Sequence, residues 1–276
     1  MRERERVERD EKRETTPRVP SLTALLRHLF FQTYDHLGSL IVLNLVWAVL
    51  NLPWCLAACL LFPLASLHPR GGEVGLGAAV SAAAVCIGLI SPPTAALLNA
   101  VREADLGLGG RVRVFLRAFR RRFWAAQAVG LLLAGAAGLL ALNFSYYAGL
   151  GGPWRPVGWV LLGIVLWAGV GLLTVAPMWV EAAAQTGRVR EGFLAAAGLV
   201  LSRPGLCLGA SAVAGLLLLA GAATGVGLFL GVVSVVGLWV VLSHEALSSA
   251  RKGCDLSASR RLRELWRPWE WKEPGA

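Results

Sequence analysis

The sequence predicts an all-α membrane protein with six transmembrane helices, and three observations carry this prediction. First, 56% of the 276 residues are hydrophobic and only 16% are charged, whereas soluble domains are about 25% charged and 45–50% apolar. The mean hydropathy is correspondingly high, at +0.59. Second, six apolar runs approach or exceed the roughly 20 residues that a helix needs to cross the hydrocarbon core. Third, almost all basic residues lie in alternate connections between these runs.

The apolar runs define a membrane domain over residues 21–253, between a charged tail (1–20) and a basic tail rich in tryptophan (254–276). The six expected spans cover residues 37–67, 74–101, 123–147, 157–184, 204–222 and 225–242. Proline inside a helix removes a backbone hydrogen bond, so kinks or breaks are expected within the first, second and fourth spans. The prolines concerned are Pro53, Pro63, Pro92, Pro93 and Pro177.

The distribution of arginine and lysine sets the orientation. Of the 27 basic residues, all but Arg70 and Arg155 fall before the first span, after the last span, or in the second or fourth connection. Basic residues accumulate on the cytoplasmic side of membrane proteins. We therefore expect both termini in the cytoplasm of a multi-pass protein of the inner (plasma) membrane.

A shorter amphipathic segment precedes each odd-numbered span. In the second of these, residues 111–123, apolar side chains fall on one helical face and arginines on the other. The arginines are Arg113, Arg117, Arg120 and Arg121. A basic amphipathic helix next to a span is expected to lie in the cytoplasmic interface and contact anionic headgroups. Nucleic-acid binding is the rival interpretation of such arginines, but the adjoining apolar faces disfavour it.

The ends of the even-numbered spans resemble one another, since each continues through alanine-rich turns towards a glycine. These glycines are Gly107, Gly187 and Gly253, and glycine is a usual C-terminal signal of a helix. The sequence therefore predicts three helical-hairpin units, each with an interfacial helix, a span and a returning span.

The two tails differ in charge. Residues 2–14 hold six basic and six acidic side chains, which is typical of a solvated tail, with partner binding as the alternative. The C-terminal tail combines arginines with Trp266, Trp269 and Trp271. Because tryptophan prefers the headgroup level, we expect this tail to rest on the cytoplasmic leaflet, or else to bind a protein.

Two groups of polar residues are candidate sites. Asn44, Trp47 and Asn51 share one face of the first span, where they could line a cavity or form hydrogen bonds to neighbouring helices. The second group lies at the cytoplasmic ends of the even-numbered spans. Its members are Asn99, Glu181, His244 and Glu245. They either form a polar cluster at a cytoplasmic mouth or pair with nearby Arg188 or Arg251.

Signatures of catalysis and of cofactors are missing from the sequence. The four histidines are dispersed, and there is no HExxH, GxSxG or Walker-type motif. The five cysteines form no CxxC pair, and their odd number argues against a disulfide framework. We expect neither an enzyme nor a cofactor or metal site.

Several short motifs resemble those of the YesL-like family of bacterial integral membrane proteins. They are Asn44-Leu-Val-Trp47, Pro53, Ser91-Pro-Pro-Thr-Ala-Ala-Leu97 and Val101-Arg102, followed by the arginine-rich stretch 113–124. The likeness is clearest over residues 21–135 and continues by hydropathy to about residue 253. The interval from Asn44 to Pro92 is longer than usual for the family and contains a turn-back at 68–72.

The resemblance implies a role near sugar transport and no chemistry, because the family has no known biochemical function. Its members often occur beside carbohydrate-uptake systems of the ABC type. We therefore expect a non-enzymatic accessory or assembly partner of such a system, in contact with the lipid bilayer and with ABC-type permease subunits. The alternative is a bundle that transports or conducts a small solute by itself, which should place polar residues at mid-membrane.

Overall fold

The computed structural model describes residues 21–66, 74–103, 106–224 and 231–249, and these residues form helices without any strand. Five stretches are long and apolar enough to cross a membrane. They are Leu37–Leu61, Leu76–Arg102, Leu108–Ala148, Gly152–Thr186 and Pro204–Thr224. The all-α class and the membrane character expected from composition are thereby confirmed. Both tails and the turn-back at 68–72 lie outside the described residues.

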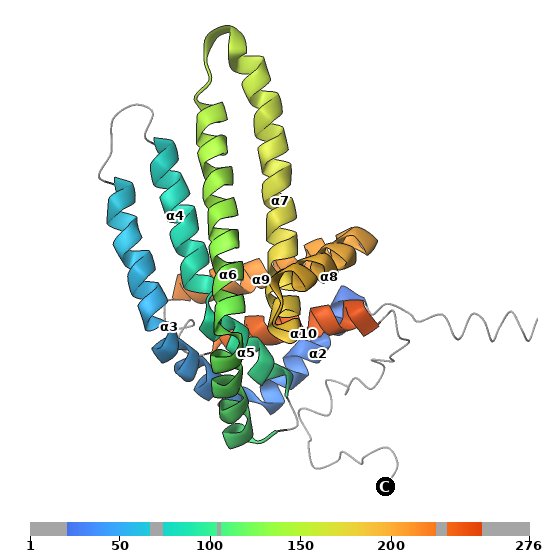
Figure 1. The fold of residues 1–276 in the computed structure, drawn as a ribbon. Coiled ribbons are helices and arrows are strands. Elements are labelled where there is room, and N and C mark those ends of the chain that lie inside the picture. The colour runs from blue at the N-terminus through green and yellow to red at the C-terminus, as the bar shows by residue number, and fades with distance from the viewer. Residues whose placement is uncertain (1–20, 67–73, 104–105, 225–230, 250–276) are drawn as a thin grey trace, which may run out of the picture.

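Two upright hairpins form one side of the molecule (Figure 1). The first joins α3 (Leu37–Ser66) to α4 (Val74–Leu89), and the second joins α6 (Leu108–Ala148) to α7 (Arg155–Thr186) through a short 3-10 turn. The four helices stand in the order α3, α4, α6, α7, each packed against the next. The remaining helices gather around the lower part of the two hairpins in this view. They are α2 (Leu22–Asp35), α5 (Pro92–Arg102), α8 (Val189–Ser202), α9 (Pro204–Thr224) and α10 (Val232–Ser249).

Glycines bring α6 close to α4. A Cβ atom on Gly130 would overlap the carbonyl oxygen of Ile90, which directly follows α4, and one on Gly138 would lie 3.2 Å from that of Ala79. Between them on the same face stands Ala134, which is buried. Small residues at this spacing let two helices approach closely in lipid, where packing rather than hydrophobicity drives association.

The helix α10 is buried on nearly every side. It contacts α2, α3, α5, α7 and α9. Its Trp239 is fully buried, and the indole Nε1 donates a 2.7 Å hydrogen bond to the carbonyl oxygen of Ala210 in α9. Its neighbours therefore place α10 in the interior of the bundle.

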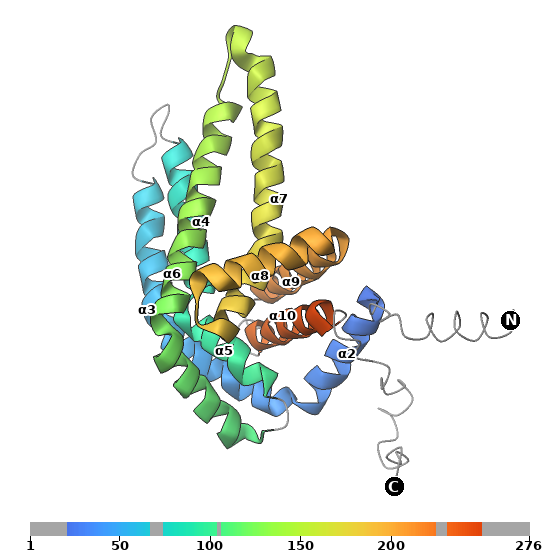
Figure 2. The same ribbon diagram turned by 45° about the vertical axis from the view of Figure 1, so that its right-hand side comes forward.

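The third predicted hairpin differs from the first two. Both ribbon views show α9 and α10 running across the lower part of the α6–α7 hairpin rather than alongside it (Figure 2). The apolar stretch Val232–Ser248 in α10 is shorter than the five candidate spans, and residues 225–230 lie outside the described part. The sixth span at 225–242 and the three equivalent hairpin units therefore stay predictions.

Prolines interrupt only one of the three spans in which breaks were expected. Residues 90 and 91 separate α4 from α5, and Pro92 and Pro93 then begin α5. In contrast, α3 continues through Pro53 and Pro63, and α7 continues through Pro177. A single proline removes one backbone donor, and neighbouring helices can compensate for that loss in a membrane bundle. Two adjacent prolines remove two successive donors, which explains the break before α5.

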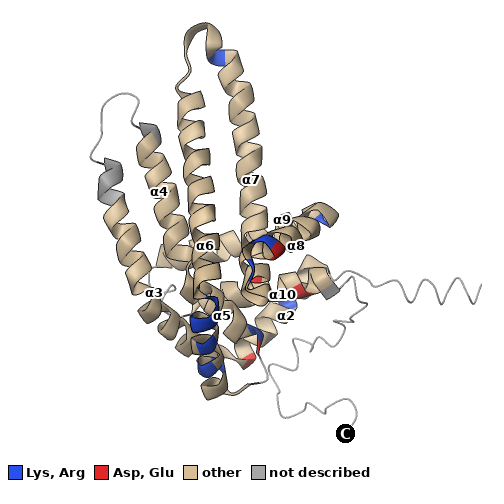
Figure 3. Cartoon of the chain, viewed as in Figure 1, with Lys and Arg blue, Asp and Glu red and all other residues tan. Residues whose placement is uncertain are grey.

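The segment 111–123 is part of a longer helix and not a separate interfacial one. No glycine or proline stands between Arg111 and Val129, so α6 continues for 41 residues. At 1.5 Å per residue such a helix is about 60 Å long, twice the hydrocarbon thickness of roughly 30 Å. Its basic half must therefore extend beyond a bilayer that its second half crosses. Figure 3 shows these basic residues clustered at one end of the molecule, which we call the basic end.

The other two amphipathic segments are separate helices. His36 separates α2 from α3, and Arg203 separates α8 from α9. Gly187, in the left-handed conformation, ends α7 as expected, and its N–H donates to the carbonyl oxygen of Ala183 at 2.8 Å. Gly107 instead precedes α6, because α5 has already ended at Arg102. Gly253 lies outside the described residues.

Candidate functional site

Arg102 connects three helices at the basic end. It is the last residue of α5, and its guanidinium forms ion pairs with Glu181 of α7 and Glu245 of α10. The Nε atom of Arg102 lies 3.2 Å from Oε1 of Glu245. Glu181 is completely buried, whereas the side chain of Glu245 is 46% exposed. One guanidinium thus balances one buried and one accessible carboxylate.

Amide side chains extend this ion cluster. Gln185, one turn after Glu181, donates a 3.1 Å hydrogen bond to Glu181 Oε1, and its Nε2 also lies 3.2 Å from His244 Nδ1. On the other side, Asn99 donates to the carbonyl oxygens of Ala95 at 2.8 Å and Ala184 at 3.2 Å. The side-chain oxygen Oδ1 of Asn99 accepts a 2.9 Å hydrogen bond from the guanidinium of Arg122 in α6. We call these seven residues the polar cluster: Asn99, Arg102, Arg122, Glu181, Gln185, His244 and Glu245.

The charges of the polar cluster balance. Burial, with a smaller contribution from the Arg102 guanidinium, lowers the pKa of His244 to about 4. The imidazole is therefore neutral at pH 7, and two arginines face two glutamates. A buried carboxylate is tolerated only when it is paired and hydrogen-bonded, and Glu181 meets this condition through Arg102 and Gln185. Its second oxygen, Oε2, has no hydrogen-bond partner among the described residues.

A second polar group holds the break between α4 and α5 in place. In a continuous helix the carbonyl oxygens of Gly88 and Leu89 would accept from the N–H groups of residues 92 and 93, but both are prolines. Asn51 of α3 donates to the Gly88 oxygen at 2.8 Å. The Thr94 hydroxyl donates to the Leu89 oxygen at 2.7 Å. Side chains thus replace both of the missing backbone donors.

The remaining contacts of this junction come from the same face of α3. The Ser91 hydroxyl donates to Asn51 Oδ1 at 2.6 Å, and the Trp47 indole donates to Thr94 Oγ1 at 3.0 Å. Asn44, one turn earlier, is completely buried. The structure therefore accounts for Trp47 and Asn51 as hydrogen-bonding partners of a helix break. A binding role for Asn44, Trp47 and Asn51 stays a prediction.

Sequence reasoning grouped Asn99, Glu181, His244 and Glu245 but missed the residues that join them. Glu181 pairs with Arg102, whereas Arg188, the residue before α8, forms an ion pair with Glu191 in the first turn of α8 at 2.5 Å. Arg251 lies outside the described residues. Gln185 was detectable, because it stands four residues after Glu181 on one helical face. Arg102 carried no such signal, since its partners lie 79 and 143 positions away.

The residues expected at the lipid surface are partly described. Arg113, Arg117, Arg120 and Arg121 are exposed on α6, while Phe115 on the opposite face is fully buried. Arg111 lies on the buried side and donates to Ser39 Oγ at 2.7 Å. Contact between the exposed arginines and anionic headgroups stays a prediction. Trp266, Trp269 and Trp271 lie outside the described residues.

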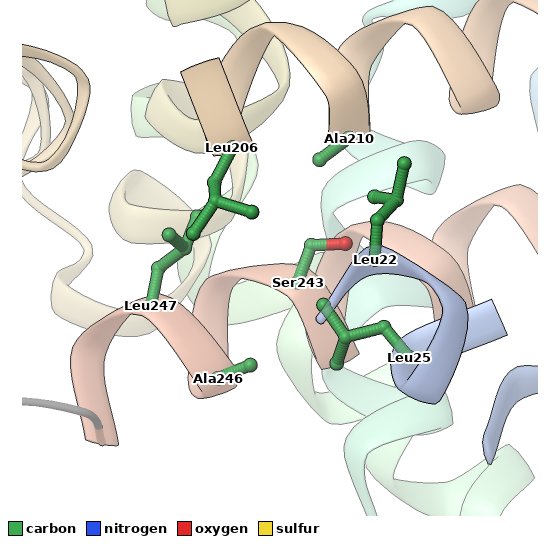
Figure 4. A pocket seen from close by; sticks show the side chains of 7 residues that line it. All are labelled: Leu22, Leu25, Leu206, Ala210, Ser243, Ala246 and Leu247. Atoms are coloured by element: carbon green, nitrogen blue, oxygen red, sulfur yellow. The ribbon is translucent and has the colours of Figure 1, made fainter. Parts of the chain in front are cut away.

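A small cavity lies where α2, α9 and α10 meet (Figure 4). Its volume of about 10 Å³ leaves room for about one water molecule, and leucine and alanine side chains line most of it. Figure 4 shows the Ser243 hydroxyl directed into it as the only polar group among the labelled side chains. This cavity is too small for a substrate. Within the described residues, no three His, Cys, Asp or Glu side chains lie close enough together to hold a metal ion.

Long apolar helices and a charge-balanced cluster at one end define a multi-pass helical membrane protein. Residues 40–144, from α3 to the end of α6, match the model of a family described as protein of unknown function, DUF624. The YesL-like proteins are DUF624 proteins, so the resemblance seen in the sequence is confirmed over this region. No curated protein and no solved structure matches the chain.

Proposed function

We propose that the protein is a non-enzymatic accessory or assembly partner of a solute-uptake system in the bacterial plasma membrane. Both termini are placed in the cytoplasm in this proposal, as the distribution of basic residues indicates. The observation that carries it is an unoccupied helix face on α7. Carbohydrate as the solute, and ABC-type permease subunits as the partner, follow from the family resemblance alone.

The face on α7 is built for close helix packing. Gly163, Trp167 and Gly171 stand at intervals of four residues and therefore share one side of the helix. A Cβ atom on Gly163 or Gly171 would have no atom of another described residue within 4 Å, and Trp167 is 77% exposed. Gly130 and Gly138 of α6 have the opposite environment, because Ile90 and Ala79 fill the space beside them. We infer that a helix of another protein packs against Gly163 and Gly171.

The polar groups of the bundle disfavour transport by this chain alone. A transporter places accessible polar groups near mid-membrane, often at broken helices. Here the helix break is satisfied by Asn51 and Thr94, and the charges of the polar cluster pair with one another. These contacts support an assembly role over a solute pathway through the described residues.

Co-purification tests the proposal. The tagged protein is isolated from membranes of its own host, and ABC permease subunits in the eluate are quantified by mass spectrometry. We expect permease subunits with the wild type and their loss with Gly163→Leu/Gly171→Leu, which blocks the α7 face. Gly135→Leu is the matched control, because Gly135 of α6 is also free of neighbours within 4 Å but lies on a different helix.

Two results would overturn the proposal. One is an unchanged yield of permease subunits with the doubly substituted α7. The other is flux of a sugar into liposomes that contain only this protein, which would establish the alternative function of a transporter.

A further inference from the structure

A second, much larger cavity lies between α4, α5, α7, α9 and α10. Its volume is about 530 Å³, within the range of roughly 300–1,000 Å³ that is usual for ligand sites. Leu97 and Leu98 of α5 form one wall, Pro177 and Val180 of α7 another, and Val236 and Val240 of α10 the floor. All of these side chains are apolar.

The helix break and small residues create this space. Ile90, at the end of α4, and Thr94, in the first turn of α5, both line the cavity, so the change of direction at Pro92 opens one side of it. On the α9 side, three of the six lining residues are small and apolar, namely Ala212, Ala214 and Gly215. A Cβ atom on Gly215 would have no other residue of the described part of the chain within 4 Å. The side chains of α9 are therefore too short at these positions to fill the space between the helices.

The three hydroxyl groups in the walls already donate hydrogen bonds to backbone carbonyl oxygens. The Thr94 hydroxyl donates to the Leu89 carbonyl and the Thr174 hydroxyl to the Val170 carbonyl, each at 2.7 Å. The Ser211 hydroxyl donates to the Thr174 carbonyl at 3.4 Å. A hydrophilic solute would lose its hydration in this cavity without gaining hydrogen bonds, which is costly. The walls therefore select a hydrocarbon.

The cavity opens towards the surface of the bundle. At its rim Leu173 is 70% exposed and Val85 48%, whereas Val236 and Val240 at the floor are 9% and 7% exposed. The rim residues belong to stretches long enough to cross a membrane. Their exposed side chains therefore face lipid, and the opening is accessible from the hydrocarbon layer.

The polar cluster marks the interfacial end of the cavity. Arg102 follows Leu98 by four residues in α5, and His244 follows Val240 by four residues in α10, so each lies one turn beyond a lining residue. Glu181 directly follows Val180. Ionised groups belong near the headgroups and apolar ones deeper in the bilayer, which places the cavity at the depth of acyl chains.

We propose that this cavity binds one acyl chain of a membrane phospholipid, which enters sideways between α4 and α7. Open space in a packed interior forfeits contacts between its lining atoms, and the bilayer supplies hydrocarbon chains at high concentration on the open side. This inference is independent of the proposed accessory function, since it concerns the chain alone in a bilayer.

Photolabelling tests the proposal. The full-length protein is reconstituted alone into phosphatidylethanolamine/phosphatidylglycerol vesicles with a trace of phosphatidylcholine that carries a diazirine in one acyl chain. After illumination, adducts are mapped by peptide mass spectrometry. We expect adducts on Val236 or Val240, which annular lipid cannot reach. We also expect adducts on the exposed Trp167, which report general lipid contact.

Cavity-filling variants supply the control. Gly215→Leu, and independently Ala176→Leu from the α7 wall, should lower labelling of Val236 and Val240 by about tenfold, because the added side chain occupies the space that the acyl chain needs. Labelling of Trp167 should not change. Gly135→Leu, outside the cavity, should behave as the wild type. Each variant is first checked for a monodisperse peak in gel filtration, and either filling variant alone suffices for the test.

The proposal is overturned if Val236 and Val240 acquire no adduct in the wild type, which is the result expected when another part of the chain or a second copy fills the cavity. Undiminished labelling of these residues in a folded filling variant overturns it as well. Neither result bears on the α7 face, whose test is co-purification with permease subunits.

Discussion

Replacing Glu181 with glutamine should destabilise the protein far more than the same replacement of Glu245, although both carboxylates pair with Arg102. Glu181 is fully buried, whereas the side chain of Glu245 is 46% exposed. Breaking a buried ion pair from one side costs about 3–5 kcal/mol. Arg102 remains 24% exposed and keeps Glu245 in the Glu181→Gln variant, which lowers the expected cost to about 2–3 kcal/mol. An accessible pair is worth about 0–1 kcal/mol, which is the loss expected for Glu245→Gln.

Thermal unfolding in detergent measures this difference, with the fluorescence of the 11 tryptophans as the signal. At about 2–4 °C per kcal/mol, the midpoint should fall by about 4–12 °C for Glu181→Gln and by less than about 4 °C for Glu245→Gln. Replacing Arg102 and Glu181 together with methionine should recover most of the loss, because no unpaired charge is then buried. Equal shifts of the midpoint for Glu181→Gln and Glu245→Gln would refute the reasoning. So would a double methionine variant that loses as much stability as the two single methionine variants, Arg102→Met and Glu181→Met, lose together.

Three further variants probe other features in the same unfolding assay. Asn51→Leu leaves the Gly88 carbonyl without its donor and should cost about 1–3 kcal/mol; an unchanged midpoint would contradict the role assigned to Asn51 in the helix break. Gly130→Ala forces a methyl group against the Ile90 carbonyl and should cost about 1–3 kcal/mol. Gly135→Ala, with open space beside it among the described residues, should be neutral or stabilise by up to about 1 kcal/mol. Equal changes of the unfolding midpoint in these two variants would rule out close packing at Gly130. Because the pKa of His244 is about 4 in the folded protein and about 6.5 when unfolded, the unfolded state binds the proton first as pH falls. Stability should therefore be retained above pH 6.5 and decline towards pH 4 by about 1.4 kcal/mol per unit, and His244→Asn should show a shallower decline; parallel pH profiles for the two proteins would refute this.

The sequence predicts the helices well because their signals are local. Apolar length and charge placement identify the candidate spans, and Gly187 ends α7 as a left-handed glycine should. The polar residues at the ends of α5, α7 and α10 are recognisable in the same way, since each follows an apolar run.

Features that depend on how the helices pack are not predictable from one sequence. The apolar composition of α10 is the same for a lipid-facing helix as for a buried one, and only its neighbours make it the latter. The pairing of Arg102 with Glu181 depends on the crossing of α5 and α7. Periodicity also identified an amphipathic segment at 111–123 correctly as helical, but it does not reveal whether that segment is separate from the span or continuous with it.

The helix break between α4 and α5 constrains the order in which the protein can assemble. As α4 leaves the translocon, the Gly88 carbonyl has no N–H partner in its own helix, and an unpaired polar group in hydrocarbon costs several kcal/mol. The donor that relieves this cost sits on Asn51 of the preceding span, which has been synthesised earlier and is already available. The helix α3 thus supplies the hydrogen-bond donor that α4 needs in the membrane. We therefore expect α3 and α4 to leave the insertion machinery together, already packed as a hairpin. A variant that lacks this donor should therefore insert less efficiently, in addition to the lower unfolding midpoint expected of the protein that does fold.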